Sequence, residues 1–110
     1  MTEIAPYWRN YIDGAWADGG AGRLEVTDPS TGAPLAEVAR ADAADIDRAV
    51  QAARRVHLSG ALTAMRPVER GRMVQAMGRW ILDHAEEMAA ILAAEQGKPL
   101  WEARIEVAGA

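Results

Sequence analysis

The sequence has no cysteine and no long hydrophobic run. Without cysteine, the 110 residues cannot form a disulfide, a thiolate metal site or a cysteine nucleophile. No stretch approaches the roughly 18 apolar residues of a membrane-spanning helix, so we expect no membrane partner. Residues 1–10 carry Glu3 and Arg9 and no continuous apolar segment, which is unlike a signal peptide and favours a cytoplasmic location.

Apolar residues make up 50% of the chain, which favours a folded chain over disorder. The net charge of −4 is uneven: residues 1–47 hold nine acids and three bases, residues 48–80 one acid and seven arginines, and residues 81–110 six acids and two bases. We expect the arginines to pair with acidic segments of the same or a neighbouring chain. Nucleic-acid binding is the alternative, but it needs a recognisable motif, and the pI near 5.1 does not favour it. No nucleic-acid partner is therefore expected.

The first 41 residues have the turn signals and alternation of short β-strands. An Asp13-Gly14 pair lies between apolar and aromatic residues, which indicates a hairpin because both central positions favour a positive φ. Patterns over 24–27 and 35–39 predict two further strands, and turn residues at 28–32 separate them. We therefore predict an N-terminal β-meander over 1–41, which must pack on another layer because so small a meander is not stable alone.

From Asp42 the apolar residues recur at helical spacing, so residues 42–110 are predicted to be helical. Asp42 is a good N-cap for a first helix, which is expected to end near Arg55. The segment 57–65 contains a Ser-Gly pair and is predicted to be a loop.

Pro67 suits the first turn of a second helix. One apolar stripe then continues through Val74, Met77, Ile81, Ala85, Met88 and Leu92. The stripe is long for one globular helix, so we expect a break near Asp83-His84 and a left-handed cap at Gly97. A further amphipathic helix begins at Leu100, and its pattern still continues at Ala110, which predicts that the sequence is a piece of a longer chain.

No pattern inside the chain indicates a catalytic centre. His57 and His84 lack the spacing of a histidine metal motif, and we expect structural or surface roles for both. The glycines at 19–22 lack the strand-to-helix context of a phosphate-binding loop. Glu86 and Glu87 are adjacent, so they point to different sides of a helix. The residues themselves predict an α+β segment, an N-terminal β-meander followed by amphipathic helices, without an internal active site.

Five motifs occur in the order found in the aldehyde dehydrogenase superfamily. The resembling segments are the opening hairpin at 11–16, the turn Asp28-Pro29-Ser30-Thr31-Gly32 (Asp in place of the usual Asn), a first helix at 45–53, a second helix within 67–92, and the signature Glu95-Gln96-Gly97-Lys98-Pro99-Leu100 followed by Glu102-Ala103. Each motif alone is weak, but together they cover residues 10–110. The sequence thus resembles the N-terminal segment of an aldehyde dehydrogenase.

The resemblance implies that the chain begins a Rossmann-like α/β cofactor domain, with residues 42–110 as the helical part of a truncated NAD(P)-binding domain. In this family a cysteine thiolate attacks the aldehyde, hydride passes to NAD or NADP, and a glutamate base activates the water that releases the carboxylic acid. None of the family's catalytic or cofactor-contacting residues has a matching position here. The resemblance therefore implies an inactive N-terminal fragment of a homo-oligomeric enzyme with a small-molecule aldehyde as substrate.

The resemblance implies one site that reaches into this segment. Some relatives bind a monovalent cation through two backbone carbonyls before the turn and an acid before Gly-Lys-Pro, and the matching positions are Val26, Thr27 and Glu95. A hard cation suits such oxygen ligands. The alternative is that Glu95 only adds charge at the end of its helix. The Glu-Gln-Gly-Lys-Pro sequence also resembles the succinate-semialdehyde dehydrogenase branch more than betaine-aldehyde types, although other branches share it.

Two other functions stay open. A non-catalytic α+β interaction module derived from the family would have no cofactor domain or catalytic cysteine after Ala110, whereas an enzyme fragment would. An arginine-dependent nucleic-acid binder would show salt-dependent binding. For the isolated chain, the sequence predicts that the apolar stripe over 74–92 is exposed and that the chain is loosely packed or self-associating.

Overall fold

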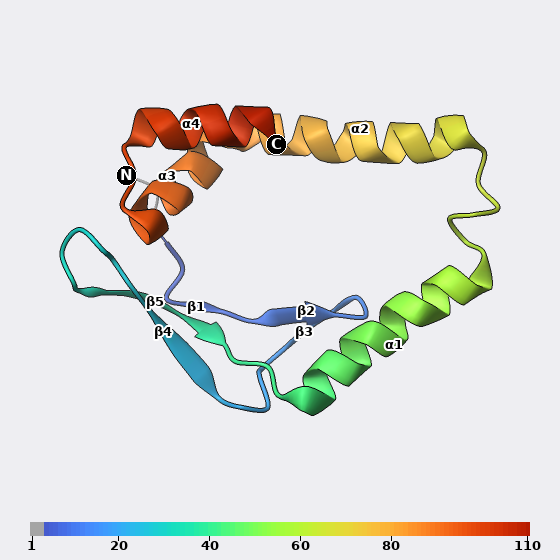
Figure 1. The fold of residues 1–110 in the computed structure, drawn as a ribbon, viewed down its shortest axis with the longest axis horizontal. Helices are drawn as coiled ribbons and strands as arrows, with labels where there is room; N and C mark the ends of the chain where they lie inside the picture. The colour runs from blue at the N-terminus through green and yellow to red at the C-terminus, as the bar shows by residue number, and fades with distance from the viewer. Residues whose placement is uncertain (1–3) are drawn as a thin grey trace.

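The computed structural model describes residues 4–110, which form short strands followed by helices (Figure 1). The strands are β1 (Tyr7–Trp8), β2 (Asn10–Ile12), β3 (Ala15–Ala17), β4 (Arg23–Thr27) and β5 (Pro34–Ala39). The helices are α1 (Ala43–Ser59), α2 (Pro67–Asp83), α3 (Ala85–Gln96) and α4 (Leu100–Gly109). This order confirms the α+β class that the sequence predicts.

The hairpin forms where the Asp-Gly pair predicts it. β2 and β3 are antiparallel, and the turn residues Asp13 and Gly14 have φ values of 53° and 80°. Two positive φ values in a two-residue loop match the right-handed twist of the strands. Tyr11 and Trp16 face each other across the hairpin with ring centroids 4.9 Å apart, so an aromatic pair stabilises it.

The remaining strands form a separate sheet in the order β1-β5-β4. β4 and β5 are antiparallel, whereas β1 runs parallel to β5 and pairs Tyr7 with Glu37. The strands of the N-terminal part thus divide into a hairpin and a three-stranded mixed sheet. The sequence did not predict β1 because two residues are too few to show a strand period.

α1 begins as the sequence predicts and ends later. Asp42 caps its first turn, and a reciprocal bond from the Asp45 side chain completes a capping box. The helix runs past Arg55 to Ser59, because Gly60 takes a left-handed φ of 74° and donates its N–H to the His57 carbonyl. The predicted loop over 57–65 thus starts only at Gly60, since the Ser-Gly pair caps the helix instead of breaking it.

The break near Asp83-His84 is confirmed: α2 ends at Asp83, and α3 begins at Ala85. Gly97 ends α3 with a φ of 69°, as expected of a left-handed cap. A Cβ on Gly97 would lie 2.8 Å from Pro29 Cγ, so this cap packs directly against the turn at 28–32. The contact joins the end of α3 to the turn between β4 and β5.

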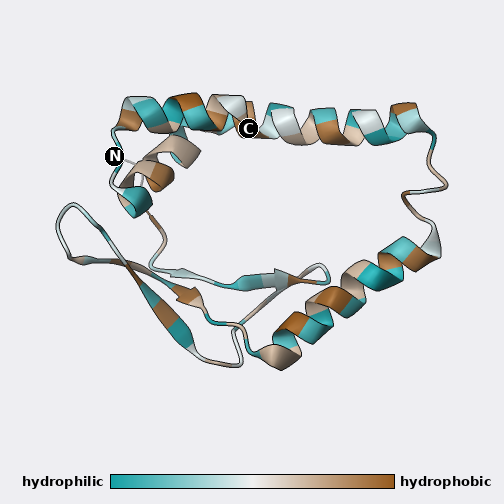
Figure 2. Ribbon diagram, in the orientation of Figure 1, coloured by the Kyte–Doolittle hydropathy of each residue, from teal (hydrophilic) through white to brown (hydrophobic). Residues whose placement is uncertain are grey.

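The helices form an open frame with the sheets rather than a closed core (Figure 1). The core lies between α3 and α4, where Ala89 and Ala103 are fully buried at 0% exposure and Val107 is 6% exposed. α2 has no buried residue. Figure 2 shows hydrophobic and hydrophilic residues alternating along α1 and α2, as in helices with one apolar face. Within residues 4–110, no helix is long and apolar enough to cross a bilayer.

Candidate functional site

The residues that resemble a cation site lie at the end of β4 and the end of α3. Val26 and Thr27 are the last residues of β4, and the pairing of β4 with β5 shifts register between them. The extra residue at this shift is Leu35 of β5, which has no partner in β4. Glu95 is exposed in the last turn of α3.

The structure brings two of these three residues into one hollow. Val26 and Glu95 line a hollow of about 300 Å³ between β4, β5 and α3. Trp8, Leu35 and Ile91 are among its other lining residues, whereas Thr27 is not. The hollow is mostly apolar, and Glu95 is the one acidic side chain that lines it.

The chemistry of this hollow excludes the commonest metal sites. Transition metals and zinc are held by clusters of histidine, cysteine and carboxylate side chains. Across residues 4–110 no group of three or more such side chains could hold a metal ion. A cation here would depend on one carboxylate and on backbone carbonyls, so the predicted monovalent cation stays a prediction.

The glycines at 19–20 do not form a phosphate cradle. A Cβ on Gly19 would collide with the Arg40 backbone, and a Cβ on Gly20 would collide with the Asp42 carboxylate. The space beside Gly20 thus holds a negative group, which repels a phosphate. These residues do not fit the pyrophosphate of a dinucleotide.

The Gly20 amide has a structural partner in Asp45, a carboxylate that is only 3% exposed. Its Oδ2 accepts from the Gly20 N–H at 2.7 Å and from the Asp42 N–H at 3.0 Å, and Arg48 pairs with Oδ1. The backbone N–H of Gly20, followed by that of Asp42, lowers the pKa of Asp45 below its ordinary 3.8. Asp45 is therefore ionised and fully engaged, and it links the β3–β4 turn to α1. The sequence indicated only its place in the first turn of the helix.

Both histidines take part in contacts that belong to the helices around them. His57 is exposed near the end of α1, where its backbone carbonyl accepts from Gly60. His84 lies at the α2–α3 junction, stacks on Trp80 with ring centroids 4.0 Å apart, and has Nδ1 2.8 Å from the Trp80 carbonyl oxygen. Neither arrangement resembles a general base with a nucleophile beside it.

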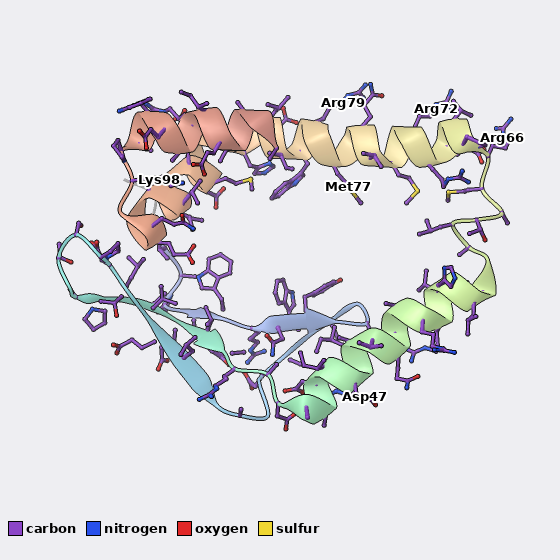
Figure 3. The ribbon with its side chains drawn as sticks, viewed as in Figure 1. Asp47, Arg66, Arg72, Met77, Arg79 and Lys98 are labelled. Carbon is purple, nitrogen blue, oxygen red and sulfur yellow. The ribbon has the colours of Figure 1, made fainter. Side chains whose placement is uncertain are left out.

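Acidic residues of α3 and α4 form salt bridges that help hold the two helices together. Glu86 accepts from Arg104 at 2.7 Å, and this bond lowers the pKa of Glu86 and raises that of Arg104. Lys98, at the turn between α3 and α4 in Figure 3, donates to Glu106 at 2.5 Å, and its side chain is only 17% exposed. The lysine of the Gly-Lys-Pro signature thus stabilises the helical hairpin formed by α3 and α4.

The arginine-rich segment, residues 48–80, is only partly neutralised by ion pairs. Arg48 pairs with Asp45, Arg55 with Asp13, and Arg66 with Glu69. These pairs confirm that the segment pairs with acidic groups of the same chain. Arg72 and Arg79 point away from the frame (Figure 3), and neither forms an ion pair with a residue in the described part of the chain.

Comparison with known proteins agrees with this architecture. A model of the aldehyde dehydrogenase family matches residues 16–110. The chain is similar to an N-succinylglutamate 5-semialdehyde dehydrogenase from Burkholderia mallei, with 41% identity over 108 residues, covering 98% of this chain and 20% of the relative.

Solved structures show the same similarity. An NAD-dependent aldehyde dehydrogenase from Sinorhizobium meliloti matches with a TM-score of 0.89 and 30% identity, over 97% of this chain and 22% of that one. A betaine aldehyde dehydrogenase from Staphylococcus aureus, in complex with NAD⁺, matches with a TM-score of 0.86 and 29% identity, over 90% of this chain and 20% of that one. The chain spans about a fifth of the length of these relatives. Because the family model matches most of the sequence, this chain belongs to the aldehyde dehydrogenase family.

Proposed function

We propose that this chain is the N-terminal part of an NAD(P)-dependent aldehyde dehydrogenase that oxidises an aldehyde to a carboxylic acid. The family match over residues 16–110 carries this proposal. The chain spans about a fifth of its relatives and has no cysteine, whereas the reaction needs a thiolate nucleophile. The 110-residue chain alone is therefore inactive, and its role is to supply one wall of a larger cofactor domain.

We infer a semialdehyde that carries a carboxylate as the substrate class of the full-length parent. The support is the name of the relative from Burkholderia mallei, which acts on N-succinylglutamate 5-semialdehyde. Succinate semialdehyde, favoured by the resemblance of Glu95-Gln96-Gly97-Lys98-Pro99, belongs to the same chemical class. NAD is favoured over NADP because the similar enzyme from Sinorhizobium meliloti is NAD-dependent.

The test compares the full-length parent with the 110-residue chain. Both are assayed for aldehyde-dependent reduction of NAD⁺ and NADP⁺ with N-succinylglutamate 5-semialdehyde, succinate semialdehyde and betaine aldehyde. We expect activity from the parent with a carboxylated semialdehyde and none from the short chain. A parent that binds no nicotinamide cofactor and oxidises none of the three would support a non-catalytic interaction module instead.

We also propose that the parent binds a monovalent cation at Val26, Thr27 and Glu95. The support is that Val26 and Glu95 line one hollow and that a bulge interrupts the strand pairing between Val26 and Thr27. Potassium is titrated against the Tm of the parent, its Glu95→Gln variant and a Glu87→Gln control from the same helix. Potassium should raise the Tm of the wild type and the control more than that of Glu95→Gln. Equal responses of all three proteins would leave Glu95 with a purely local role.

The homo-oligomeric state and the cytoplasmic location of the parent stay predictions. Size-exclusion chromatography with light scattering on the parent measures the first, and cell fractionation measures the second.

A further inference from the structure

The chain contains two Asp-Gly sequences, Asp13-Gly14 and Asp18-Gly19, and the structure holds them in different ways. An aspartyl side chain can react with the amide nitrogen of the next residue, and glycine leaves that nitrogen accessible because it has no Cβ. Asp13-Gly14 is the turn of the β2–β3 hairpin, and Asp18-Gly19 follows β3. The side chains of the two aspartates are 62% and 67% exposed, so exposure does not distinguish them.

The Asp13-Gly14 turn is open and weakly held. A Cβ on Gly14 would meet no atom within 4 Å, and Asp13 has a φ of 53°, a left-handed conformation that residues with a Cβ rarely adopt. Each strand of the hairpin has three residues, and within residues 4–110 these two strands pair only with each other. An isolated two-stranded hairpin is marginal in water, so this turn opens locally at low cost.

The Asp18-Gly19 pair is held from both sides. A Cβ on Gly19 would collide with the Arg40 backbone, so this glycine packs directly on the chain that follows β5. The Asp18 carboxylate accepts from the Tyr7 hydroxyl at 2.8 Å and pairs with Arg9 Nε at 3.3 Å. These contacts must break together before Asp18 can turn toward the Gly19 nitrogen. Local opening is therefore more costly here than at the hairpin turn.

We propose that Asp13 is a site of spontaneous isoaspartate formation in the native protein and that Asp18 is protected from it. The Gly14 nitrogen bonds to Asp13 Cγ, and one carboxyl oxygen leaves as water with the amide proton and a proton from solvent. The product is a five-membered succinimide ring. A water molecule then adds at the main-chain carbonyl carbon of Asp13, and the bond from this carbon to the Gly14 nitrogen breaks. The chain now continues through Cγ, its mass is unchanged, and no oxidant or reductant takes part.

Arg55 of α1 restrains this reaction. Its Nη2 lies 2.6 Å from Asp13 Oδ2, and the two side chains are 60% and 62% exposed. Ring closure turns Cγ toward the Gly14 nitrogen and removes a carboxyl oxygen, so the ion pair must separate first. Exposed ion pairs add little stability, and loss of this one should speed the reaction only by roughly twofold to fivefold.

Isoaspartate at position 13 disturbs the hairpin. It adds one atom to the main chain inside a two-residue turn, and that turn sets the pairing of Tyr11 with Trp16. It also moves the free carboxylate onto Cα, away from its place beside Arg55. Because α1 contacts β2, the modification loosens the attachment of α1 to the hairpin. The proposal concerns these residues alone and does not rest on aldehyde oxidation.

The experiment follows both sites in one molecule of the full-length parent, incubated at neutral pH. Trypsin cleaves after Arg9 and Arg23 and releases residues 10–23, which carry both Asp-Gly pairs. Electron-based fragmentation breaks the Cα–Cβ bond of isoaspartate and thus locates it at 13 or 18. We expect it to form at 13 roughly fivefold faster or more in the native parent, and at similar rates at both positions in urea. Equal native rates, a faster rate at 18, or no isoaspartate at 13 in the native parent would overturn the proposal.

Two variants of neighbouring arginines test the restraint. Arg55→Gln removes the ion pair, and Arg54→Gln is the matched control, because Arg54 forms no ion pair within residues 4–110. Isoaspartate at 13 should form roughly twofold to fivefold faster in Arg55→Gln and at the wild-type rate in Arg54→Gln. The rate at 18 should be the same in all three proteins. An unchanged rate at 13 in Arg55→Gln, or equal acceleration in both variants, would contradict the role of Arg55.

Discussion

The helical hairpin α3–α4 and the arm formed by α1 and α2 are held in different ways. α3 and α4 pack through small buried side chains, with Ala89 and Ala103 at 0% exposure. α1 and α2 bury only Asp45 and Ala52 between them. The bond from the Gly20 N–H to Asp45 ties the start of α1 to the β3–β4 turn, and α2 contacts α3 and α4. The hairpin that carries the Gly-Lys-Pro signature thus forms most of its own core, whereas the arm depends on what packs against it.

This difference indicates which pair of helices contributes more to the stability of the segment. Close packing of small residues lets two helix backbones approach, and any enlargement there disturbs both helices. Polar end contacts fix the direction of a helix but bury little apolar surface. Substitutions in the hairpin should therefore cost more than equivalent substitutions in the arm.

The largest effect is expected for Ala103→Asp in the 110-residue chain. It buries a charge without a partner in the α3–α4 core and should lower the free energy of unfolding by on the order of 3 kcal/mol or more. The matched change Ala76→Asp in α2 lies on an exposed face and should cost less than about 1 kcal/mol. Urea titration followed by circular dichroism measures both. Equal losses would mean that α2 is as well packed as the hairpin.

A smaller effect of opposite sign distinguishes two glycines. Gly97→Ala places a Cβ at a positive φ and 2.8 Å from Pro29 Cγ, which should cost about 1–3 kcal/mol. Gly71→Ala in α2 meets no atom within 4 Å and should stabilise the chain by about 0.5–1 kcal/mol, because alanine favours helix. Thermal unfolding of the two variants and the wild type measures both changes in stability. A neutral Gly97→Ala would show that the cap does not press on the turn.

The polar contacts of the arm should respond to pH. The pKa of Asp45 is lowered in the folded chain, so its ionised form adds stability above the ordinary value of 3.8, and that stability is lost as the pH falls through the folded pKa. The Tm of the wild type should exceed that of Asp45→Asn at neutral pH, and the difference should shrink below pH 3.8. Taking the difference removes the parallel contributions of Asp28 and Glu86, whose pKa values are also lowered. A pH-independent difference would assign the effect to shape alone.

The smallest effect is expected for Glu86→Gln. It removes the ion pair with Arg104, whose side chains are 72% and 49% exposed, and exposed pairs add little stability. Its Tm should fall slightly at low salt and match the wild type at high salt. A large loss that persists at high salt would place this pair among the contacts that hold the hairpin together.

Local patterns in the sequence predicted the elements whose causes are local. The Asp13-Gly14 turn, the Asp42 cap, the break at Asp83-His84 and the Gly97 cap each depend on neighbouring residues, and each is confirmed. β1 and its parallel pairing with β5 depend on distant residues, and no local period indicates them. The buried Asp45 likewise acquires its main partner, Gly20, from another element. Val26 and Glu95 were related only through the family resemblance, since no spacing rule joins a strand end to a helix end.

The parallel pairing of β1 with β5 has a consequence for the order of events during synthesis. The β2–β3 hairpin can close as soon as its own few residues emerge, because hairpins form within microseconds. Tyr7 must wait until Glu37 has been translated, and the ribosome adds only about 5–20 residues each second. For a second or more, on that estimate, β1 remains a free strand with Trp8 exposed. The N-terminal strand is therefore the part of this chain with the greatest opportunity to pair wrongly or to meet a chaperone.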